Sequence, residues 1–230
     1  MNEWAVTHPG AVRPHNEDAM VCRPDAGLYA VADGAGGHQA GDVASAMIAD
    51  TLASLPAALP PDQALQQVRL RLAAVHDALR ERAAPGSIIA STVVVLLIRN
   101  GYFVCLWAGD SRAYRLRHGR LEAMTKDHSL VQDMVDRGAL TEEEAERHPQ
   151  ANIITRAVGA GDDPLMLDKV TGPVEPGDRF LLCSDGLCKT LDRATLAHLT
   201  IEPEPAERLV AAALAAGVRD NVTAVVVAGA

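Results

Sequence analysis

The sequence has little of several features that mark whole classes of protein. Its 230 residues include four cysteines at irregular spacing. Cys22, Cys105 and Cys183 stand in apolar, strand-like segments, where cysteine behaves as a small hydrophobic residue. We therefore expect reduced thiols and a cytoplasmic location rather than a disulfide framework. The longest apolar run, 93–98, is far below the roughly 20 residues that span a bilayer. An acid near the start replaces the basic region of a signal peptide, so we expect no leader and no membrane association.

Positive charge is also scarce. The chain carries 30 acidic residues against 21 Lys and Arg, a net charge of −9, and contains no basic run. This balance argues against nucleic acid or an anionic membrane surface as the main partner. It suits a protein that gathers cations, although a modest acidic excess also serves ordinary solubility. We expect a monomer.

Motifs of several phosphate-handling proteins are missing. No G-x-x-x-x-G-K-[ST] loop occurs. The glycine loop 34–39 imitates a dinucleotide-binding turn, but Gln39 stands where the third glycine is required. None of the four cysteines is followed six residues later by the Arg that a cysteine phosphatase uses. Nucleophilic cysteine catalysis is therefore excluded.

The order of apolar patterns predicts one α+β domain, residues 1–230, without repeats or a linker. Period-2 and β-branched segments dominate, and Asn100-Gly101 and His118-Gly119 are turns of predicted hairpins. Helices come in pairs, with Asp62 as the expected N-cap of the second, and a polar helical insert at 127–150 forms a small flap. Strands are expected near 4–7, 19–22, 27–32, 91–98, 102–108, 113–117, 120–123, 166–171, 180–184 and 222–227, and helices near 42–55, 62–83, 129–148, 192–199 and 205–216.

Four aspartates share one context, at the end of an apolar strand or directly before one. They are Asp33, Asp110, Asp185 and Asp220. Three of them have a neighbouring glycine, which lets backbone and ligand approach closely. Strand ends that meet at one rim would form an all-oxygen site suited to Mg²⁺ or Mn²⁺. For any single pair, Asp-Gly is equally well explained as turn chemistry.

Several short motifs, taken together and in order, resemble the protein phosphatase 2C family of metal-dependent Ser/Thr protein phosphatases. They are R-P-H-N-E-D (13–18), D-G-A-G-G-H (33–38), A-G-D-S-R (108–112), H-P-Q-A-N-I-I-T-R-A-V-G (148–159), S-D-G-L (184–187) and D-N-V-T (220–223). The similarity covers nearly the whole chain and points to a bacterial minimal catalytic domain. It implies a central antiparallel β-sandwich flanked by pairs of helices, in four layers, α-β-β-α.

The resemblance also implies roles for individual residues. Asp33 would bridge two Mn²⁺ or Mg²⁺ ions, with the Gly34 carbonyl, Asp185 and Asp220 completing the ligands. A hydroxide bridging the two ions would attack the phosphorus of phosphoserine or phosphothreonine.

Around this centre, the resemblance makes Arg13 the phosphate clamp and His38 the proton donor to the leaving group. Asp18 would support a metal through water, and Asp110 would hold a third metal ion near the flap. The implied partners are a phosphorylated protein substrate and an opposing bacterial Ser/Thr kinase.

Three alternatives stay open from the residues alone. The same centre could hydrolyse a small phosphate ester instead of a phosphoprotein. The chain could be a non-catalytic phosphoprotein-binding module, although the intact Asp33, Asp185 and Asp220 argue against a degenerate site. It could also be a structural cation-binding domain without turnover.

Overall fold

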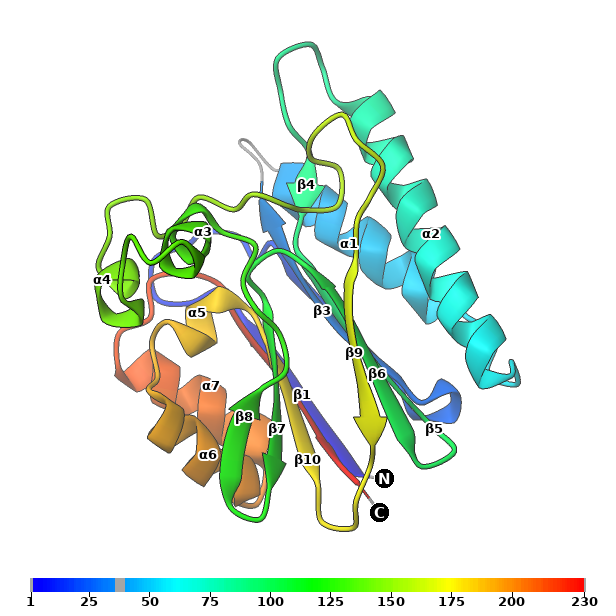
Figure 1. Cartoon of the computed structure of the whole chain (residues 1–230), viewed down its shortest axis with the longest axis vertical. Coiled ribbons are helices and arrows are strands. Elements are labelled where there is room, and N and C mark those ends of the chain that lie inside the picture. Colours follow the sequence, from blue (N-terminus) through cyan, green and yellow to red (C-terminus); the bar gives the residue numbers. More distant parts are fainter. Residues whose placement is uncertain (1, 36–39, 230) are drawn as a thin grey trace.

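Two antiparallel sheets lie face to face in the computed structural model, which describes residues 2–35 and 40–229 (Figure 1). The first sheet has the order β1 (Asn2–His8), β11 (Val222–Ala228), β10 (Arg179–Cys183), β7 (Arg112–Arg117) and β8 (Arg120–Ala123). The second has the order β2 (Asp18–Arg23), β3 (Leu28–Ala35), β5 (Val93–Arg99), β6 (Tyr102–Ala108) and β9 (Asp168–Pro173), and the short β4 (Ala90–Ser91) pairs with β3.

Helices cover the outer face of each sheet. The second sheet packs against α1 (Ala40–Ala53) and α2 (Pro61–Arg82), and the first packs against α5 (Asp185–Cys188), α6 (Arg193–Ile201) and α7 (Pro205–Ala215). The order of layers is therefore α-β-β-α, and the predicted α+β sandwich is confirmed. No helix in the described ranges is long and apolar enough to cross a membrane.

Strand β5 shows why a continuous apolar run suits the middle of this architecture. Successive side chains of a strand point to opposite faces. Val93, Val95 and Leu97 therefore pack under α1 and α2, whereas Val94 and Leu96 pack between the sheets. Both faces are buried, so the strand has no polar alternation. Phe103 and Phe180 meet across the same inner core, with ring centroids 5.4 Å apart.

Both predicted tight hairpins are present. Asn100 and Gly101 have φ values of 52° and 76°, and His118 and Gly119 have 50° and 76°. Two consecutive residues with positive φ match the twist of the strands they join. The hairpins connect β5 to β6 and β7 to β8.

The helix predictions need three corrections. Helix α2 begins at Pro61 with Pro60 before it, and no side chain caps it, so Asp62 is not the N-cap. The insert forms two helices, α3 (Leu130–Asp136) and α4 (Glu142–Glu146), which Gly138 at φ +70° separates. The capping box of Thr141 and Glu144 is confirmed. Two short elements were not predicted: α5 and the 3-10 helix η1 (Pro24–Ala26).

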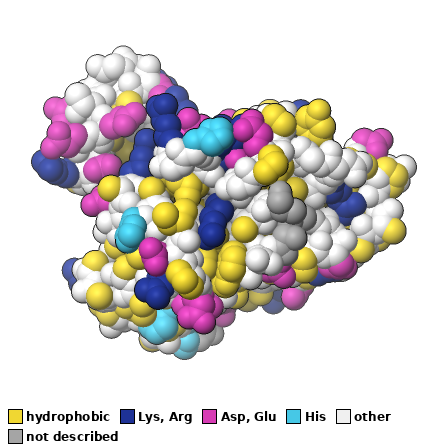
Figure 2. Space-filling view, turned by 90° about the horizontal axis from the view of Figure 1, so that it is seen from below, with side chains coloured by type: hydrophobic (Ala, Val, Ile, Leu, Met, Phe, Trp, Pro, Cys, Tyr) yellow, Lys and Arg dark blue, Asp and Glu magenta, His cyan; other side chains and the backbone are white. Residues whose placement is uncertain are grey.

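The strand directions bring the carboxylates to one end of the sandwich. Asp33 lies near the end of β3, Asp185 begins α5 two residues after β10 ends, and Asp220 lies two residues before β11. The termini lie at the opposite end, because β1 starts and β11 finishes there. Figure 2 shows that end with acidic and basic side chains interspersed among hydrophobic ones, rather than gathered into a basic field.

An ion pair at the termini end stabilises the first sheet. Arg117 on β7 donates from Nε and Nη2 to the two carboxylate oxygens of Asp178, at 2.7 and 2.6 Å, and Asp178 is only 1% exposed. Burial raises the pKa of Asp178, but hydrogen bonds from Arg117 and from the Glu175 N–H outweigh it, so the pKa lies below its ordinary value. This stabilisation is therefore present above the ordinary pKa and is lost as pH falls through the lowered one.

We expect Arg117→Ala to lower the free energy of unfolding by clearly more than a surface variant does, because it leaves the Asp178 carboxylate, which is 1% exposed, without its cation. Urea denaturation at pH 7 measures the change. Arg147→Ala is the matched control, since Arg147 pairs with Glu143 on the surface, where side chains are 79% and 74% exposed. It should cost less than about 1 kcal/mol. Equal losses in the two variants would contradict a special role for Arg117.

Candidate metal centre

Asp18, on β2, is linked to both sheets, through Asp33 on β3 and Thr223 on β11. It pairs with Asp33 in the ladder between β2 and β3. Its Oδ2 accepts hydrogen bonds from Ser184 Oγ at 2.7 Å and Thr223 Oγ1 at 2.6 Å, which ties β2 to the first sheet. Its Oδ1 is buried and has no hydrogen-bond partner within the described ranges. Burial raises the pKa of Asp18 to about 7, and the nearby charges of Asp185 and Asp220 add to it, against the two hydroxyl hydrogen bonds.

Asp33 lies within β3 and not at its end, because the strand continues to Ala35. Hydrogen bonds fix its backbone: the Thr92 N–H and Ser91 Oγ donate to the Asp33 carbonyl at 2.8 and 2.9 Å. Burial raises the pKa of Asp33 well above its ordinary value, and the charges of four other aspartates raise it further. These are Asp18, Asp185, Asp110 and Asp220. The aspartates that the sequence analysis named as candidates are therefore close enough for their negative charges to repel one another.

Gly34 makes room for the start of α1. A Cβ at Gly34 would lie 2.2 Å from the Gly41 carbonyl oxygen and 2.7 Å from that of Glu17. The Gly34 N–H also donates to the Glu17 carbonyl at 3.0 Å. A side chain at position 34 would therefore push α1 and the loop before β2 away from the centre.

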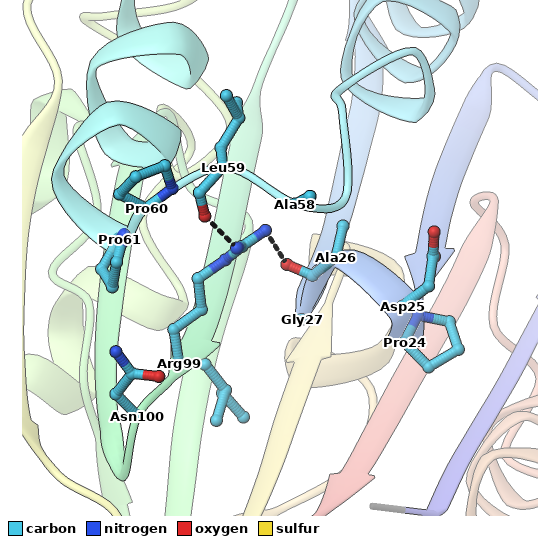
Figure 3. A pocket seen from close by; sticks show the side chains of 11 residues that line it. Pro24, Asp25, Ala26, Gly27, Ala58, Leu59, Pro60, Pro61, Arg99 and Asn100 are labelled. Atoms are coloured by element: carbon cyan, nitrogen blue, oxygen red, sulfur yellow. Dashed lines mark hydrogen bonds between the residues drawn. The ribbon is translucent and has the colours of Figure 1, made fainter.

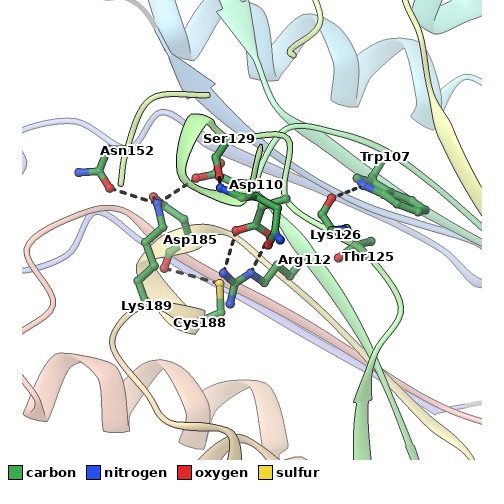
Figure 4. Close-up of polar contacts among 12 residues, drawn as sticks. Trp107, Asp110, Arg112, Thr125, Lys126, Ser129, Asn152, Asp185, Cys188 and Lys189 are labelled. Atoms are coloured by element: carbon green, nitrogen blue, oxygen red, sulfur yellow. Dashed lines mark hydrogen bonds and ion pairs between the residues drawn. The ribbon is translucent and has the colours of Figure 1, made fainter. Parts of the chain in front are cut away.

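Asp185 is the first residue of α5, and its carboxylate is bound by a lysine one helical turn later. Lys189 Nζ lies 2.8 Å from Asp185 Oδ2 and 2.9 Å from Asp110 Oδ2. It also donates to Asn152 Oδ1 at 3.2 Å, in the segment that follows α4 (Figure 4). Asp110 is 4% exposed. Lys189 was not predicted from the sequence, because the helix that carries it is only one turn long.

Asp220 binds the predicted phosphate clamp. Arg13 Nη2 donates to Asp220 Oδ2 at 2.9 Å, and both side chains are about half exposed, at 55% and 46%. Asn221 was also missed by the sequence interpretation, although it stands in the D-N-V-T motif. Its Nδ2 donates to the carbonyls of Pro9 and His15, and its Oδ1 accepts from the Glu17 N–H. Asn221 therefore holds the loop that presents Arg13 beside the carboxylates.

The donor set fits hard divalent cations. In the part of the chain that the structure describes, no group of three or more His, Cys, Asp or Glu side chains is placed so that it could hold a metal ion. The carboxylates nevertheless repel one another, and Asp18 keeps a buried oxygen without a partner. Carboxylate and carbonyl oxygens are the ligands that Mg²⁺ and Mn²⁺ prefer. The residues present therefore suit a metal centre at Asp33, Gly34, Asp185 and Asp220. His38 lies outside the described residues.

The pocket drawn in Figure 3 is lined mainly by loop residues and lies apart from this centre. It has a volume of 390 Å³ and lies beside Gly27, at the other end of β3 from Asp33. Arg99 lines it and donates from Nη1 to the Leu59 carbonyl and from Nη2 to the Ala26 carbonyl, each at 2.6 Å. A guanidinium that satisfies loop carbonyls is a structural link between the connection of α1 to α2 and η1.

Comparisons with known proteins agree with this geometry. The family model described as protein phosphatase 2C matches residues 12–209. The serine/threonine protein phosphatase PstP of Mycobacterium tuberculosis is 38% identical over 224 residues, which are 94% of this chain. The chain spans 43% of the length of that relative.

Two solved structures are similar over nearly their whole length. One is PppA of Pseudomonas aeruginosa, described as a key regulatory component of T6SS, with a TM-score of 0.90 and 44% identity over 99% of this chain and 97% of that one. The other is the catalytic domain of PstP in complex with 2 manganese ions, with a TM-score of 0.86 and 35% identity over 98% and 96% of the two chains.

Proposed function

The chain belongs to the protein phosphatase 2C family, and we propose that it is a metal-dependent serine/threonine protein phosphatase. The observation that carries the proposal is the convergence of Asp18, Asp33, Asp110, Asp185 and Asp220 at one end of the sandwich. Membership of the family supports the reaction class. The manganese-bound relative supports a divalent metal as the cofactor.

Asp33, the Gly34 carbonyl, Asp185 and Asp220 would hold two Mn²⁺ or Mg²⁺ ions, and Asp18 would support one of them through a water molecule. When bound, such ions supply a water of lowered pKa as the nucleophile and positive charge for the phosphate oxygens. The chain's own contribution is to fix the carboxylates before substrate arrives. Ser184 and Thr223 orient Asp18, and Thr92 and Ser91 hold the backbone of Asp33.

Arg13 is suited to bind the phosphate of the substrate. A guanidinium offers planar, paired donors to phosphate oxygens. Burial lowers the pKa of Arg13 less than the hydrogen bond and charge of Asp220 raise it, so the group stays charged. Asp220 and Asn221 set its position, and its exposed face would receive the phosphate. His38 would donate the proton that the serine or threonine alkoxide needs as it leaves.

A phosphoprotein is the substrate that family membership favours, with an opposing Ser/Thr kinase as the functional partner. The description of PppA as a regulatory component is consistent with a role in signalling. We further propose that the protein acts in the cytoplasm as a monomer.

The substrate class is tested with phosphoserine and phosphothreonine peptides, phosphotyrosine peptides and small phosphate esters, all assayed with Mn²⁺. We expect kcat/KM to be at least about tenfold higher for phosphoserine or phosphothreonine peptides than for small esters, because contacts with the peptide add transition-state binding of about 1.4 kcal/mol or more. A higher kcat/KM for a small phosphate ester would favour the alternative in which the same centre hydrolyses small esters instead of phosphoproteins. Peptide binding without phosphate release would favour a non-catalytic module.

A further inference from the structure

Lys189 uses its whole hydrogen-bonding capacity at the edge of the metal centre. An ammonium group has three N–H donors. The three acceptors of Lys189 Nζ are Asp185 Oδ2, Asp110 Oδ2 and Asn152 Oδ1. They come from α5, the loop between β6 and β7, and the segment after α4, so a single cation joins three parts of the chain that are distant in sequence.

The local structure explains why this side chain reaches Asp185 and Asp110. The Lys189 N–H donates to the Asp185 carbonyl at 2.8 Å at the end of α5, so residues 185 and 189 lie on the same helix face, one turn apart. Asp110 follows Gly109, whose φ is +113° and whose added Cβ would lie 2.5 Å from Thr92 Cβ. That close approach holds Asp110 at the rim and within reach of the ammonium.

We propose that Lys189 is the resident cation at the place where a third metal ion was expected at Asp110. The inference rests on the proposed function for the surrounding centre. Asp110 then forms an ion pair with the Lys189 ammonium group and does not bind a divalent ion. Asn152 lies just beyond the predicted insert at 127–150, in a segment whose Ile154 pairs with Ser129, so we extend the flap to residues 127–156. Through Asn152, the same ammonium holds this flap against the site. Lys189 is a positioning residue, because it acts through Asp185 and the flap.

Charge balance supports this assignment. Lys189 Nζ lies 2.8 Å from Asp185 Oδ2 and 2.9 Å from Asp110 Oδ2, so one ammonium group contacts both carboxylates. Removing the ammonium would leave Asp110, a 4% exposed carboxylate, beside Asp185 without a cation. A divalent ion bound between the two carboxylates would restore the positive charge that was lost.

Counting bound Mn²⁺ in solution tests the proposal. Electron paramagnetic resonance of free Mn²⁺ gives the number of ions bound per chain as the metal is titrated. Lys189→Ser should gain a further, weak site with a dissociation constant on the order of 1 mM, as for sites with few charged ligands. Lys189→Arg keeps the positive charge and should gain none. Lys169→Ser is the matched control, since Lys169 is exposed on β9 and forms no ion pair within the described ranges.

Asp110→Asn tests the same point with Lys189 still present, because an amide oxygen can also accept a hydrogen bond from the ammonium group. If Lys189 fills the site, Asp110→Asn binds as many Mn²⁺ ions as the wild type. Loss of an ion in Asp110→Asn, or an unchanged count in Lys189→Ser, would overturn the proposal. The outcome is a difference between variant and wild type, so it stands even if the wild type fails to hydrolyse phosphopeptides, which would contradict the proposed function alone.

Limited proteolysis reports on the flap contact separately. Cleavage within residues 127–156 should be several-fold faster in metal-free Lys189→Ser than in the wild type, because the link to Asn152 is lost. Saturating Mn²⁺ should slow this cleavage in Lys189→Ser by filling the vacated position. Equal cleavage of the two metal-free proteins would contradict the role of Lys189 in holding the flap.

Discussion

Asp33→Asn is expected to lower kcat/KM on a phosphothreonine peptide by a hundredfold or more while leaving the protein folded. The substitution keeps the size of the side chain and removes the charge that the proposed metal pair requires. A loss of this size is typical when one main electrostatic stabiliser of a transition state is removed, about 10²–10³-fold. Steady-state kinetics at saturating Mn²⁺ measures it.

The same substitution should not lower the stability of the metal-free protein, although it lowers activity. Burial and four neighbouring aspartates raise the pKa of Asp33, so the charged form is disfavoured in the metal-free protein. A neutral amide removes that repulsion. We therefore expect the free energy of unfolding of metal-free Asp33→Asn to equal or exceed that of the wild type. A strongly destabilised variant would show that Asp33 has a structural role instead.

Asp162→Asn is the matched control for the activity loss. Its side chain is fully exposed, and its ion pair with Arg80, at 3.5 Å, lies on the surface. The control should keep wild-type kinetics. Near-normal turnover of Asp33→Asn, together with an unchanged Asp162→Asn, would remove Asp33 from the metal centre.

Most of the fold could be predicted because its signals are local. Asn100-Gly101 fixes a hairpin by its φ values, and the apolar run 93–98 matches a strand buried on both faces. The failures were also local. Pro60 and Pro61 begin α2 without a side-chain cap, and the four residues of α5 are too few to show a helical period. Gly138, at φ +70°, divides the predicted flap helix into α3 and α4.

The site was only partly predictable, for a different reason. The four aspartates predicted at strand ends share a local signal, an apolar run beside the Asp and, for three of them, a neighbouring Gly, and the structure brings all four together. Lys189 and Asn221 carry no such pattern. Lys189 matters because α5 places it one turn after Asp185, and Asn221 because it bonds to backbone groups more than 200 residues away in sequence. Long-range hydrogen bonds of this kind leave no periodic signal.

Removal of divalent metal is expected to lower turnover of a phosphothreonine peptide by at least about a thousandfold. Without the ions, the centre presents a group of mutually repelling aspartates to a dianionic phosphate. The nearby cations Arg13 and Lys189 are already paired with Asp220, Asp110 and Asp185. Substrate binding and water activation would both be lost, and each lowers the activation free energy by several kcal/mol. The rate falls about tenfold for every 1.4 kcal/mol of that stabilisation that is lost.

The measurement compares protein dialysed against chelator with the same protein after Mn²⁺ or Mg²⁺ is restored. Chelator saturated beforehand with Mn²⁺ is the control, because it separates metal removal from any direct effect of the chelator. The melting temperature should rise with added Mn²⁺, since an ion that binds only the folded state stabilises it. This second readout does not depend on catalysis. Full turnover in a preparation shown to be metal-free would contradict the metal centre, and a melting temperature insensitive to Mn²⁺ would show that the aspartates do not bind it.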